Sequence, residues 1–415
     1  MADLRAEATS LFSVACQAAE PGLALTRALA TAPLPRPDPG GVYLVVSIGK
    51  AAVPMAECML EHLAGQPVTA LVVTNAENAR PVAGAQVFAS GHPVPDDNGI
   101  RAAEAVEALL ARATAADRVI ALISGGGSAL LPAPVPGITL ADKATVSRLL
   151  LGAGLEITQM NLIRQNLSRL KGGGLLRAAA PAGVTGYILS DVIGDDLRVI
   201  ASGLTVSPIG SRSDAQALLH SAGLWQAVPD SVRQALLSPQ SPPGPAAMAN
   251  ILIGSNRKSL QAVAAAAGAG AVILRDDLIG DVQDAAVLII AAAQSAGPNR
   301  CLIFGGETTV TLRGTGLGGR NQELALRVAM QMPDLGRDWA FLSGGTDGRD
   351  GPTEAAGGLV DAQTLSRLRA AGGDPQALLT NNDSNRALDL AGDLLITGPT
   401  GTNVADVQIL LLGPA

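Results

Sequence analysis

The stretch YLVVSIGKAAVPMAECML, residues 43–60, shows the pattern that decides the fold. A short β-branched run ends in a glycine turn, and a helical segment rich in Ala and Met follows at once. The run is apolar at nearly every position rather than at alternate positions, which is typical of a strand in a parallel sheet with both faces covered. The stretch therefore predicts a strand–turn–helix unit of an α/β protein.

Runs of the same kind recur along the chain, and most precede an Ala- and Leu-rich segment of helical length. They are ALVVTN (70–75), RVIALISGG (118–126), TGYILSD (185–191), NILIGS (250–255) and AVILRD (271–276). Strands alternating with helices predict a parallel, Rossmann-like sheet covered on both faces. Before the first strand, residues 4–30 predict a single Ala-rich helix that ends at a Pro-rich stretch.

The second half of the chain has a different pattern. CLIFGGETTVTLRGTG (301–316) predicts strands around a glycine corner, and further strands are expected in WAFLSGGTDG (339–348) and DLLITGPTGTNVADVQILLL (393–412). Strands joined by short turns favour a mixed sheet. Pro and Ser interrupt the pattern in LLSPQSPPGPAAM (236–248), which is the best candidate linker. We therefore predict two dissimilar α/β domains, residues 1–246 and 247–415.

Composition excludes several classes of protein. A chain of 415 residues with 48% hydrophobic residues and three Cys is neither disordered nor held together by disulfides. No apolar run approaches the roughly 20 residues of a membrane helix, and acidic residues stand where a secretory signal would be basic, so we expect a cytoplasmic protein. With four Phe, two Trp, two Tyr and a net charge of −7, nucleic acid is an unexpected partner. The oligomeric state stays open, with a homo-oligomer among the options.

Glycine and small polar residues follow several predicted strands, where open α/β sheets bind ligands. The richest loop is Ser124-Gly125-Gly126-Gly127-Ser128, whose main-chain N–H groups could hold phosphates. Short turns between strand and helix often need glycine for purely structural reasons, so one such loop decides little. The chain has six such loops after predicted strands, and this number favours a binding site.

Lysine is rare, since only four of the 29 basic residues are Lys. Lys50 lies between a strand and the start of a helix, where its charge is unfavourable unless an anion is shared. A solvated surface Lys is the alternative. Lys171 precedes three glycines and could also belong to an ordinary helix end.

Carboxylates lie in or beside the same loops. Mg²⁺ is commonly held by one or two carboxylates together with substrate phosphates, and a carboxylate can also accept a proton from a hydroxyl group. Asp191 and Glu307, directly after apolar strands, are the preferred pair, and Asp347 lies in a third glycine loop. Helix caps and turns are the alternative role of such residues, which also include Asp195, Asp196, Asp350 and Asp406.

Gly314-x-Gly316-x-x-Gly319 follows a strand and precedes a helix, as in a dinucleotide fingerprint. The preceding TTVTLR alternates polar and apolar residues like an antiparallel strand, and no acidic residue ends a second parallel strand. We interpret the segment as an anion-binding loop, in which Arg320 could bind a carboxylate or phosphate through two hydrogen bonds. His92 is the only loop histidine, and no histidine has a partner at metal spacing, so zinc is not expected.

Taken together, the motifs resemble those of the glycerate 2-kinases of the MOFRL (type II) family. The resemblance runs from about residue 43 to 412 and rests on an ordered set: SIGKAAVPM, SGHPVPDDNG, LISGGGSALLPAP, GITLADK, LSRLKGGGL, ILSDVIGDD, GGETTV, GGRNQELAL, SGGTDGRDGPTEAAGGLVD, NNDSN and TGPTGTNVADVQILL. It implies a Rossmann-like first domain, a MOFRL second domain and an active site in the cleft between them.

The resemblance also implies ATP- and Mg²⁺-dependent phosphorylation of the 2-hydroxyl of D-glycerate. It assigns Lys50 and Arg320 to the active site. As a hypothesis, residues 124–128 with Lys50 and Lys171 hold the triphosphate, Asp191 or Glu307 holds Mg²⁺, and Asp347 orients or deprotonates the hydroxyl. Arg320 would bind the glycerate carboxylate or the phosphoryl group.

The sequence departs from the family pattern where similar members are basic. Asn75 and Gln165-Asn166 are neutral here, and Leu204 replaces a proline. These departures concern the choice of substrate more than the reaction, so a kinase for a related small hydroxy acid is an alternative. Two others are an NAD(P)H-dependent hydroxypyruvate reductase, a label that members often carry, and a sugar-phosphate-binding regulator.

Overall fold

The computed structural model describes residues 3–239, 242, 244–298 and 300–414. The chain forms two compact units. The parallel-sheet unit contains residues 25–190 and 195–253, and the mixed-sheet unit contains described residues of 1–24, 191–194 and 254–415. These units are groups of contacting residues, so the domain limits 1–246 and 247–415 remain a prediction. The first helix and residues 191–194 group with the later part of the chain.

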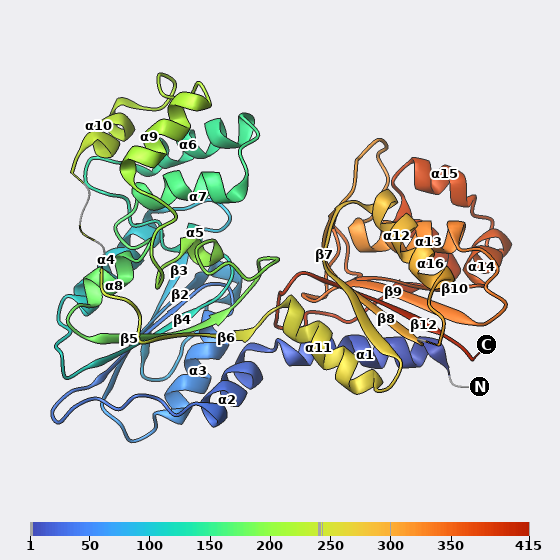
Figure 1. Ribbon diagram of the computed structural model, residues 1–415, viewed down its shortest axis with the longest axis horizontal. Helices are drawn as coiled ribbons and strands as arrows, with labels where there is room; N and C mark the ends of the chain where they lie inside the picture. Colours follow the sequence, from blue (N-terminus) through green and yellow to red (C-terminus); the bar gives the residue numbers. More distant parts are fainter. Residues whose placement is uncertain (1–2, 240–241, 243, 299, 415) are drawn as a thin grey trace. The chain divides into compact units, whose positions relative to one another are not determined.

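The parallel-sheet unit has six strands in the order β3-β2-β1-β4-β5-β6 (Figure 1). The pairs β1/β2, β2/β3, β1/β4 and β4/β5 are parallel. Their bounds are β1 (Tyr43–Ile48), β2 (Val68–Asn75), β3 (Ala85–Ser90), β4 (Arg118–Ile123), β5 (Gly183–Leu189) and β6 (Ala249–Gly254). The central strands are buried along nearly their whole length, which explains why their sequences are apolar throughout.

The strand order reverses at β1, which has β2 on one side and β4 on the other. Right-handed crossovers then place the helices after β1 and β3 on opposite faces of the sheet. Accordingly α3 (Ala52–His62) and α4 (Asp97–Leu110) cover opposite faces (Figure 1). The ends of β1 and β4 thus form the topological switch point, where α/β sheets bind ligands.

A helical layer of the same unit has an apolar core of its own, which includes Val146, Leu150, Ile163 and Leu219. The helices are α5 (Gly127–Leu130), α6 (Leu140–Gly152), α7 (Ile157–Asn166), α8 (Gly174–Ala179), α9 (Arg212–Ser221) and α10 (Asp230–Leu237), with 3₁₀ turns η1 (Ala76–Asn78) and η2 (Ile200–Ser202). Figure 1 shows α6, α7, α9 and α10 gathered together, with α5 between them and the strands.

The mixed-sheet unit has the strand order β11-β10-β9-β12-β8-β7, in which only β7 and β8 are described as a parallel pair. The antiparallel pairs join β12 to β8 and β9, and β10 to β9 and β11, which confirms the predicted mixed sheet. The strands are β7 (Ala271–Asp281), β8 (Cys301–Thr309), β9 (Trp339–Gly345), β10 (Gly357–Asp361), β11 (Leu394–Leu395) and β12 (Asp406–Leu412).

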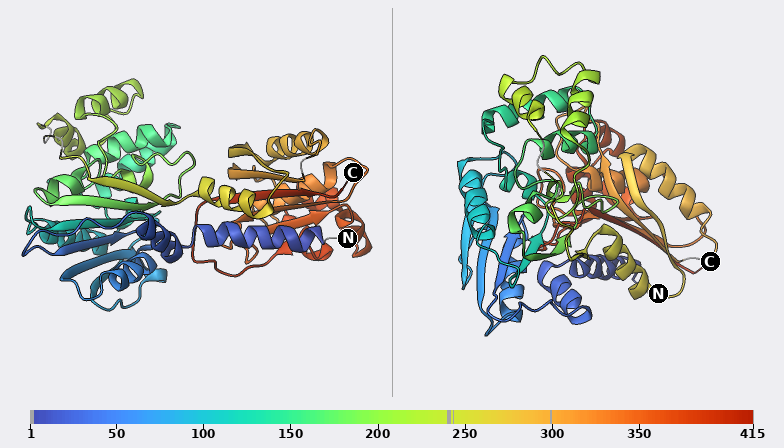
Figure 2. Two further views of the ribbon diagram at one scale, coloured as in Figure 1. Left: turned by 60° about the horizontal axis from the view of Figure 1, so that its bottom comes forward. Right: turned by 60° about the vertical axis from the view of Figure 1, so that its left-hand side comes forward.

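Both faces of this sheet are covered, so the unit has three layers (Figure 2). Alternate residues of β8 enter different cores: Ile303 packs with the first helix, and Phe304 with the helices of the opposite face. One face carries α1 (Leu4–Ala18) and α11 (Asn256–Ala267). The other carries α12 (Val282–Gln294), α13 (Arg320–Gln331) and, beside them, α14 (Thr364–Ala370), α15 (Pro375–Thr380) and α16 (Ser384–Ala391).

Two predicted elements were wrong in detail. The single helix expected over 4–30 is two helices, because α1 ends at Ala18 and α2 (Pro21–Thr31) begins at a proline, which cannot continue the helix before it. The segment 301–316 contains one strand, β8, rather than two around a glycine corner, because the strand ends at Thr309 and the chain is irregular from 310 to 319. No described helix combines the length and the apolar character needed to cross a membrane.

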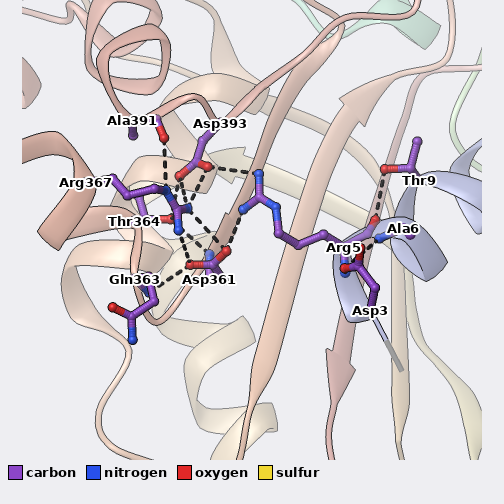
Figure 3. Close-up of polar contacts among 10 residues, drawn as sticks. All are labelled: Asp3, Arg5, Ala6, Thr9, Asp361, Gln363, Thr364, Arg367, Ala391 and Asp393. Carbon is purple, nitrogen blue, oxygen red and sulfur yellow. Dashed lines mark hydrogen bonds and ion pairs between the residues drawn. The ribbon is translucent and has the colours of Figure 1, made fainter. Parts of the chain in front are cut away.

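Helix α1 is held to the mixed-sheet unit by an ion-pair cluster at its first turn (Figure 3). Arg5 donates to Asp361 over 2.6 Å and to Asp393 over 2.9 Å. Arg367 of α14 donates to the same two carboxylates, and the Asp393 side chain is fully buried. Burial raises the pKa of Asp361, but hydrogen bonds from Arg367 and Arg5 outweigh burial and hold it below its usual value.

Replacing Arg367 with alanine is expected to lower the free energy of unfolding by about 2–3 kcal/mol, because the buried Asp393 carboxylate loses charged hydrogen bonds. Urea unfolding of the full chain would measure this. Arg369→Ala, an exposed arginine of the same helix, is the matched control and should change little. Equal effects of the two variants would contradict the structural role given to the cluster.

Candidate active site

A glycine-rich loop follows β4 at the switch point of the parallel-sheet unit. Ser124 Oγ accepts a hydrogen bond from the Ala51 N–H over 3.1 Å, and the Lys50 N–H donates to the Gly125 carbonyl over 2.9 Å. The loop after β4 is therefore tied to the loop after β1. The structure thus places Lys50 beside residues 124–128, as the sequence predicts.

The main-chain N–H groups of residues 125–128 find no acceptor within the described part of the chain. Gly126 has φ +83°, a left-handed conformation that glycine adopts without strain. A Cβ at Gly126 would lie 3.2 Å from the His92 ring and 3.2 Å from Lys50 Cγ. The loop therefore presents a row of donors beside one ammonium and one imidazole, an arrangement suited to an anion.

His92 is a member of this cluster that the sequence analysis did not assign to a site. Burial lowers its pKa, and the positive charge of Lys50 lowers it further, while Glu77 opposes both effects. The imidazole is therefore neutral at pH 7, when it can donate or accept one hydrogen bond. Its place in SGHPVPDDNG, between a strand and a helix, was the available signal.

Lys171 reaches the end of the glycine loop. Its Nζ donates to the Ser128 carbonyl over 2.6 Å and to Ser128 Oγ over 3.0 Å, and Ser128 Oγ lies 2.7 Å from Ser202 Oγ. Lys171 is buried, and burial together with the charges of Lys143 and Arg164 lowers its pKa well below the usual value. The predicted phosphate-binding residues 124–128, Lys50 and Lys171 therefore lie together.

A second cluster lies in the mixed-sheet unit, around the first residue of α13. The Arg320 guanidinium binds both oxygens of Asp406, with Nε to Oδ2 at 2.6 Å and Nη2 to Oδ1 at 3.0 Å. Its Nη1 lies 3.0 Å from Glu307 Oε1. Asp406, at the start of β12, is fully buried. Sequence reasoning named it only as a loop carboxylate and missed its pairing with Arg320.

Burial raises the pKa of Asp406 to about 6, although hydrogen bonds and the charge of Arg320 oppose the rise. The pair is therefore ionic at neutral pH. Burial tends to lower the pKa of Arg320, but the carboxylates of Asp406 and Glu307 outweigh burial and raise it. Arg320 is thus a permanently charged donor whose orientation is set by two carboxylates.

A polar cavity of about 160 Å³ opens beside Arg320. The predicted site residues Asp191, Glu307, Arg320 and Asp347 all line this cavity. The rest of its lining consists of Gly345, Asn403, Ala405 and Asp406. Within the described residues, no three carboxylate, His or Cys side chains form a ready metal cage. Mg²⁺ needs no such cage, because it takes one or two carboxylates and completes its shell with water and phosphate oxygens. The carboxylates of this cavity therefore fit that ion.

Comparison with known proteins places these features in a family. Residues 7–237 match the domain of unknown function DUF4147, and residues 300–406 match the MOFRL family. Human glycerate kinase is 39% identical over 99% of this chain and 94% of its own length. The D-glycerate 2-kinase of Thermotoga maritima is 38% identical over 89% of this chain and 90% of its own. The chain belongs to the glycerate kinase family.

The fold agrees with this membership. The crystal structure of glycerate kinase from Thermotoga maritima superposes with a TM-score of 0.92 and 36% identity, covering 99% of this chain and 100% of that one. The two α/β units, one with a parallel and one with a mixed sheet, therefore belong to the glycerate kinase fold.

In this glycerate kinase family member, the glycines of the dinucleotide-like motif serve internal packing. A Cβ on Gly314 would lie 2.3 Å from the Asn381 carbonyl oxygen, and one on Gly316 would lie 2.5 Å from Asp383 Cβ. A Cβ on Gly319 would lie 2.3 Å from the Asp350 carboxyl carbon. These glycines are therefore required for close packing against residues of the same unit.

The N–H groups of this segment are also taken. Asn382 Oδ1 accepts from Arg313 and Gly314 over 2.6 and 3.0 Å, and Asp383 Oδ1 accepts from Leu317 over 3.0 Å. The start of α13 is capped in the same way by the buried Asp350 carboxylate. The anion-loop interpretation was therefore wrong for residues 313–317, because Asn381, Asn382 and Asp383 of the same unit accept hydrogen bonds from these N–H groups.

The neutral residues that we predicted to depart from the family pattern form hydrogen bonds within the parallel-sheet unit. Asn75 Oδ1 accepts from Asn78 Nδ2 over 2.8 Å, and Asn78 Nδ2 also donates to the Lys50 carbonyl over 3.0 Å. Gln165 Nε2 donates to the Ser202 carbonyl over 3.1 Å, and its Oε1 accepts from the Ile209 N–H over 2.9 Å. These amides support the loops around Lys50 and Ser128.

Proposed function

We propose that this chain transfers the terminal phosphoryl group of ATP to the 2-hydroxyl of D-glycerate, giving 2-phospho-D-glycerate and ADP. The observation that carries the proposal is the row of N–H donors at 125–128 beside Lys50, in a chain of the glycerate kinase family. Phosphoryl transfer depends mainly on positioning and charge neutralisation, which this arrangement supplies. We further propose that the enzyme acts in the cytoplasm.

In this proposal, the parallel-sheet unit holds the triphosphate. The N–H groups of 125–128 donate to phosphate oxygens, and the Lys50 ammonium neutralises charge on the phosphoryl group as it leaves ADP. Lys171 keeps the end of the loop in place through its two hydrogen bonds to Ser128. The neutral His92 adds a donor without repelling Lys50.

The mixed-sheet unit supplies the polar cavity. Arg320, oriented by Asp406, binds the glycerate carboxylate or the transferred phosphoryl group through the N–H groups that Asp406 leaves free. Asp347 orients the 2-hydroxyl and accepts its proton. Asp191 and Glu307 are the residues that would hold Mg²⁺, which would supply neutralisation of phosphate charge.

One assay tests the function. The purified chain with ATP, Mg²⁺ and D-glycerate should release ADP and form 2-phosphoglycerate, which ³¹P NMR distinguishes from the 3-phosphate. Removing the metal with EDTA is expected to lower the rate by at least about 100-fold, because phosphate charge is then not neutralised. Added Mg²⁺ should restore the rate.

Hydroxypyruvate with NADH is the matched control for the reductase alternative. No structural observation favours that activity, because the dinucleotide-like glycines are packed against residues 381–383 and Asp350. NADH consumption without ATP-dependent phosphorylation of D-glycerate would refute the proposed function.

A further inference from the structure

A cavity of about 480 Å³ in the parallel-sheet unit adjoins the glycine loop. It lies among α5, α6, α7 and the turn 93–95, and Ser128 and Lys171 belong to its lining. Its size is that of a site for a small organic ligand rather than a single ion. The sequence analysis assigned none of the other residues around it.

Three cations that line the cavity, Lys143, Arg164 and Lys171, are partly or fully buried and have no counter-charge among the described residues, whereas a fourth, Arg148, is exposed. Lys143 Nζ donates to the Pro132 carbonyl over 2.9 Å, and Lys171 to Ser128, while the Arg164 side chain has no acceptor in the described part of the chain. No described carboxylate forms an ion pair with any of the three. By contrast, the nearby Arg169 is paired with Glu107 at 2.7 Å.

Burial and mutual repulsion act on these cations together. Burial lowers the pKa of Lys143 to about 7, with help from the charges of Arg164 and Arg169, and burial also lowers the pKa of Arg164. Lys171 is buried and the other two cations are half-buried. Proteins rarely keep cations at such positions without a counter-charge, because the lost hydration is then not fully replaced. A bound anion would supply the missing counter-charge.

The lining of the cavity also contains apolar side chains that are exposed to solvent. Val94 and Leu151 are among the most exposed large hydrophobic residues of the described chain, at 70% and 62%, and both line the cavity with Pro93, Leu140 and Leu167. Inorganic phosphate and three-carbon acids have too little apolar surface to contact these side chains. A nucleotide has both a polyphosphate and a flat base with apolar faces.

We propose that this cavity is the nucleotide pocket, in which Lys143, Arg164 and Lys171 bind the phosphates of ATP and the wall of Val94 and Leu151 covers the base and ribose. Ser128 connects the cavity to the N–H groups of the glycine loop, so the phosphate chain runs from the cavity to that loop. The inference rests on the proposed use of ATP and adds residues that recognise it.

Arg164→Met and Lys143→Met are the first test. ADP is titrated calorimetrically without D-glycerate. Each variant should weaken ADP binding by about tenfold, because one charged contact with the phosphates is lost. The KM for ATP should rise similarly and the KM for D-glycerate should stay within about twofold. Because an unpaired half-buried charge is removed, the melting temperature of Arg164→Met should not fall. Arg112→Met, an exposed arginine of the same unit, is the control.

Leu151→Asp tests the apolar wall at an exposed position, where unfolding is not expected. The new carboxylate should weaken ADP binding by at least about tenfold, because it repels the phosphates and hydrates the wall. Leu237→Asp changes an exposed leucine of the same unit that does not line the cavity, and it should bind ADP like the unchanged protein.

The pH dependence gives an independent readout. Since the Lys143 ammonium loses its proton as pH rises through about 7, ADP binding should weaken between pH 6 and 8.5. Arg164 and Arg169 stay charged over this range, and Lys171 is the other lysine near Lys143 whose pKa is lowered. In Lys143→Met the slope should be smaller than in the unchanged protein, measured in the same buffers.

Unchanged ADP affinity in folded Arg164→Met and Leu151→Asp would overturn the inference. A selective rise in the KM for D-glycerate would also overturn it, by placing the acceptor in this cavity. Because ADP is titrated without an acceptor, the result does not depend on the reaction. A protein that binds ADP here but leaves D-glycerate unchanged would refute the proposed function alone.

Discussion

Arg320→Ala is expected to lower kcat by two or more orders of magnitude in the glycerate-dependent ATP assay. The variant loses the guanidinium that we assign to the substrate carboxylate or phosphoryl group. This donor stabilises the negative charge of the transition state. It also leaves the fully buried Asp406 carboxylate without its partner, at a cost in stability of about 3–5 kcal/mol. Turnover should therefore be measured well below the melting temperature of the variant.

Two further variants separate activity from stability. Arg320→Lys keeps a charge beside Asp406 but not the paired hydrogen bonds, so stability should recover more than kcat. Arg327→Ala removes another arginine of α13 that is paired with a buried carboxylate, Glu323, outside the cavity. It should destabilise the chain and leave kcat nearly unchanged. Equal activity losses for Arg320→Ala and Arg327→Ala would show that Arg320 has only a structural role.

Lys50→Ala is expected to reduce kcat/KM by about 100-fold or more without lowering the melting temperature. The hydrogen bonds of residue 50 to Gly125 and Asn78 run through its main chain, so truncating the side chain leaves them in place. What is lost is the ammonium beside the N–H groups of 125–128. The coupled ADP assay and thermal unfolding measure the two effects.

Lys258→Ala is the matched control, because Lys258 is an exposed lysine near the start of another helix, α11. It should behave like the unchanged protein. Lys50→Arg should remain impaired, since a planar guanidinium does not replace a compact ammonium. Near-normal activity of Lys50→Ala would remove Lys50 from the site.

Much of the fold was predictable from local sequence pattern. Continuous apolar runs followed by glycine and a helix marked β1, β2, β4 and β5, because burial on both faces leaves a signal within each strand. The edge strand β3 and the short β10 were not expected, since AQVFAS is only partly buried and GGLVD offers few side chains. Pro21 carried a local stop signal that the prediction of one long helix overlooked.

Sequence alone determined the two α/β units and the glycine loop at 124–128, because these depend on neighbours along the chain. It also predicted Lys50 and Arg320 as site residues. Only the tertiary structure decided how distant charges meet. It paired Arg320 with Asp406, gave the donors of 313–317 to Asn381–Asp383, and left Lys143, Arg164 and Lys171 together without a carboxylate. Such pairings follow from strand order and helix placement, which local periodicity does not encode.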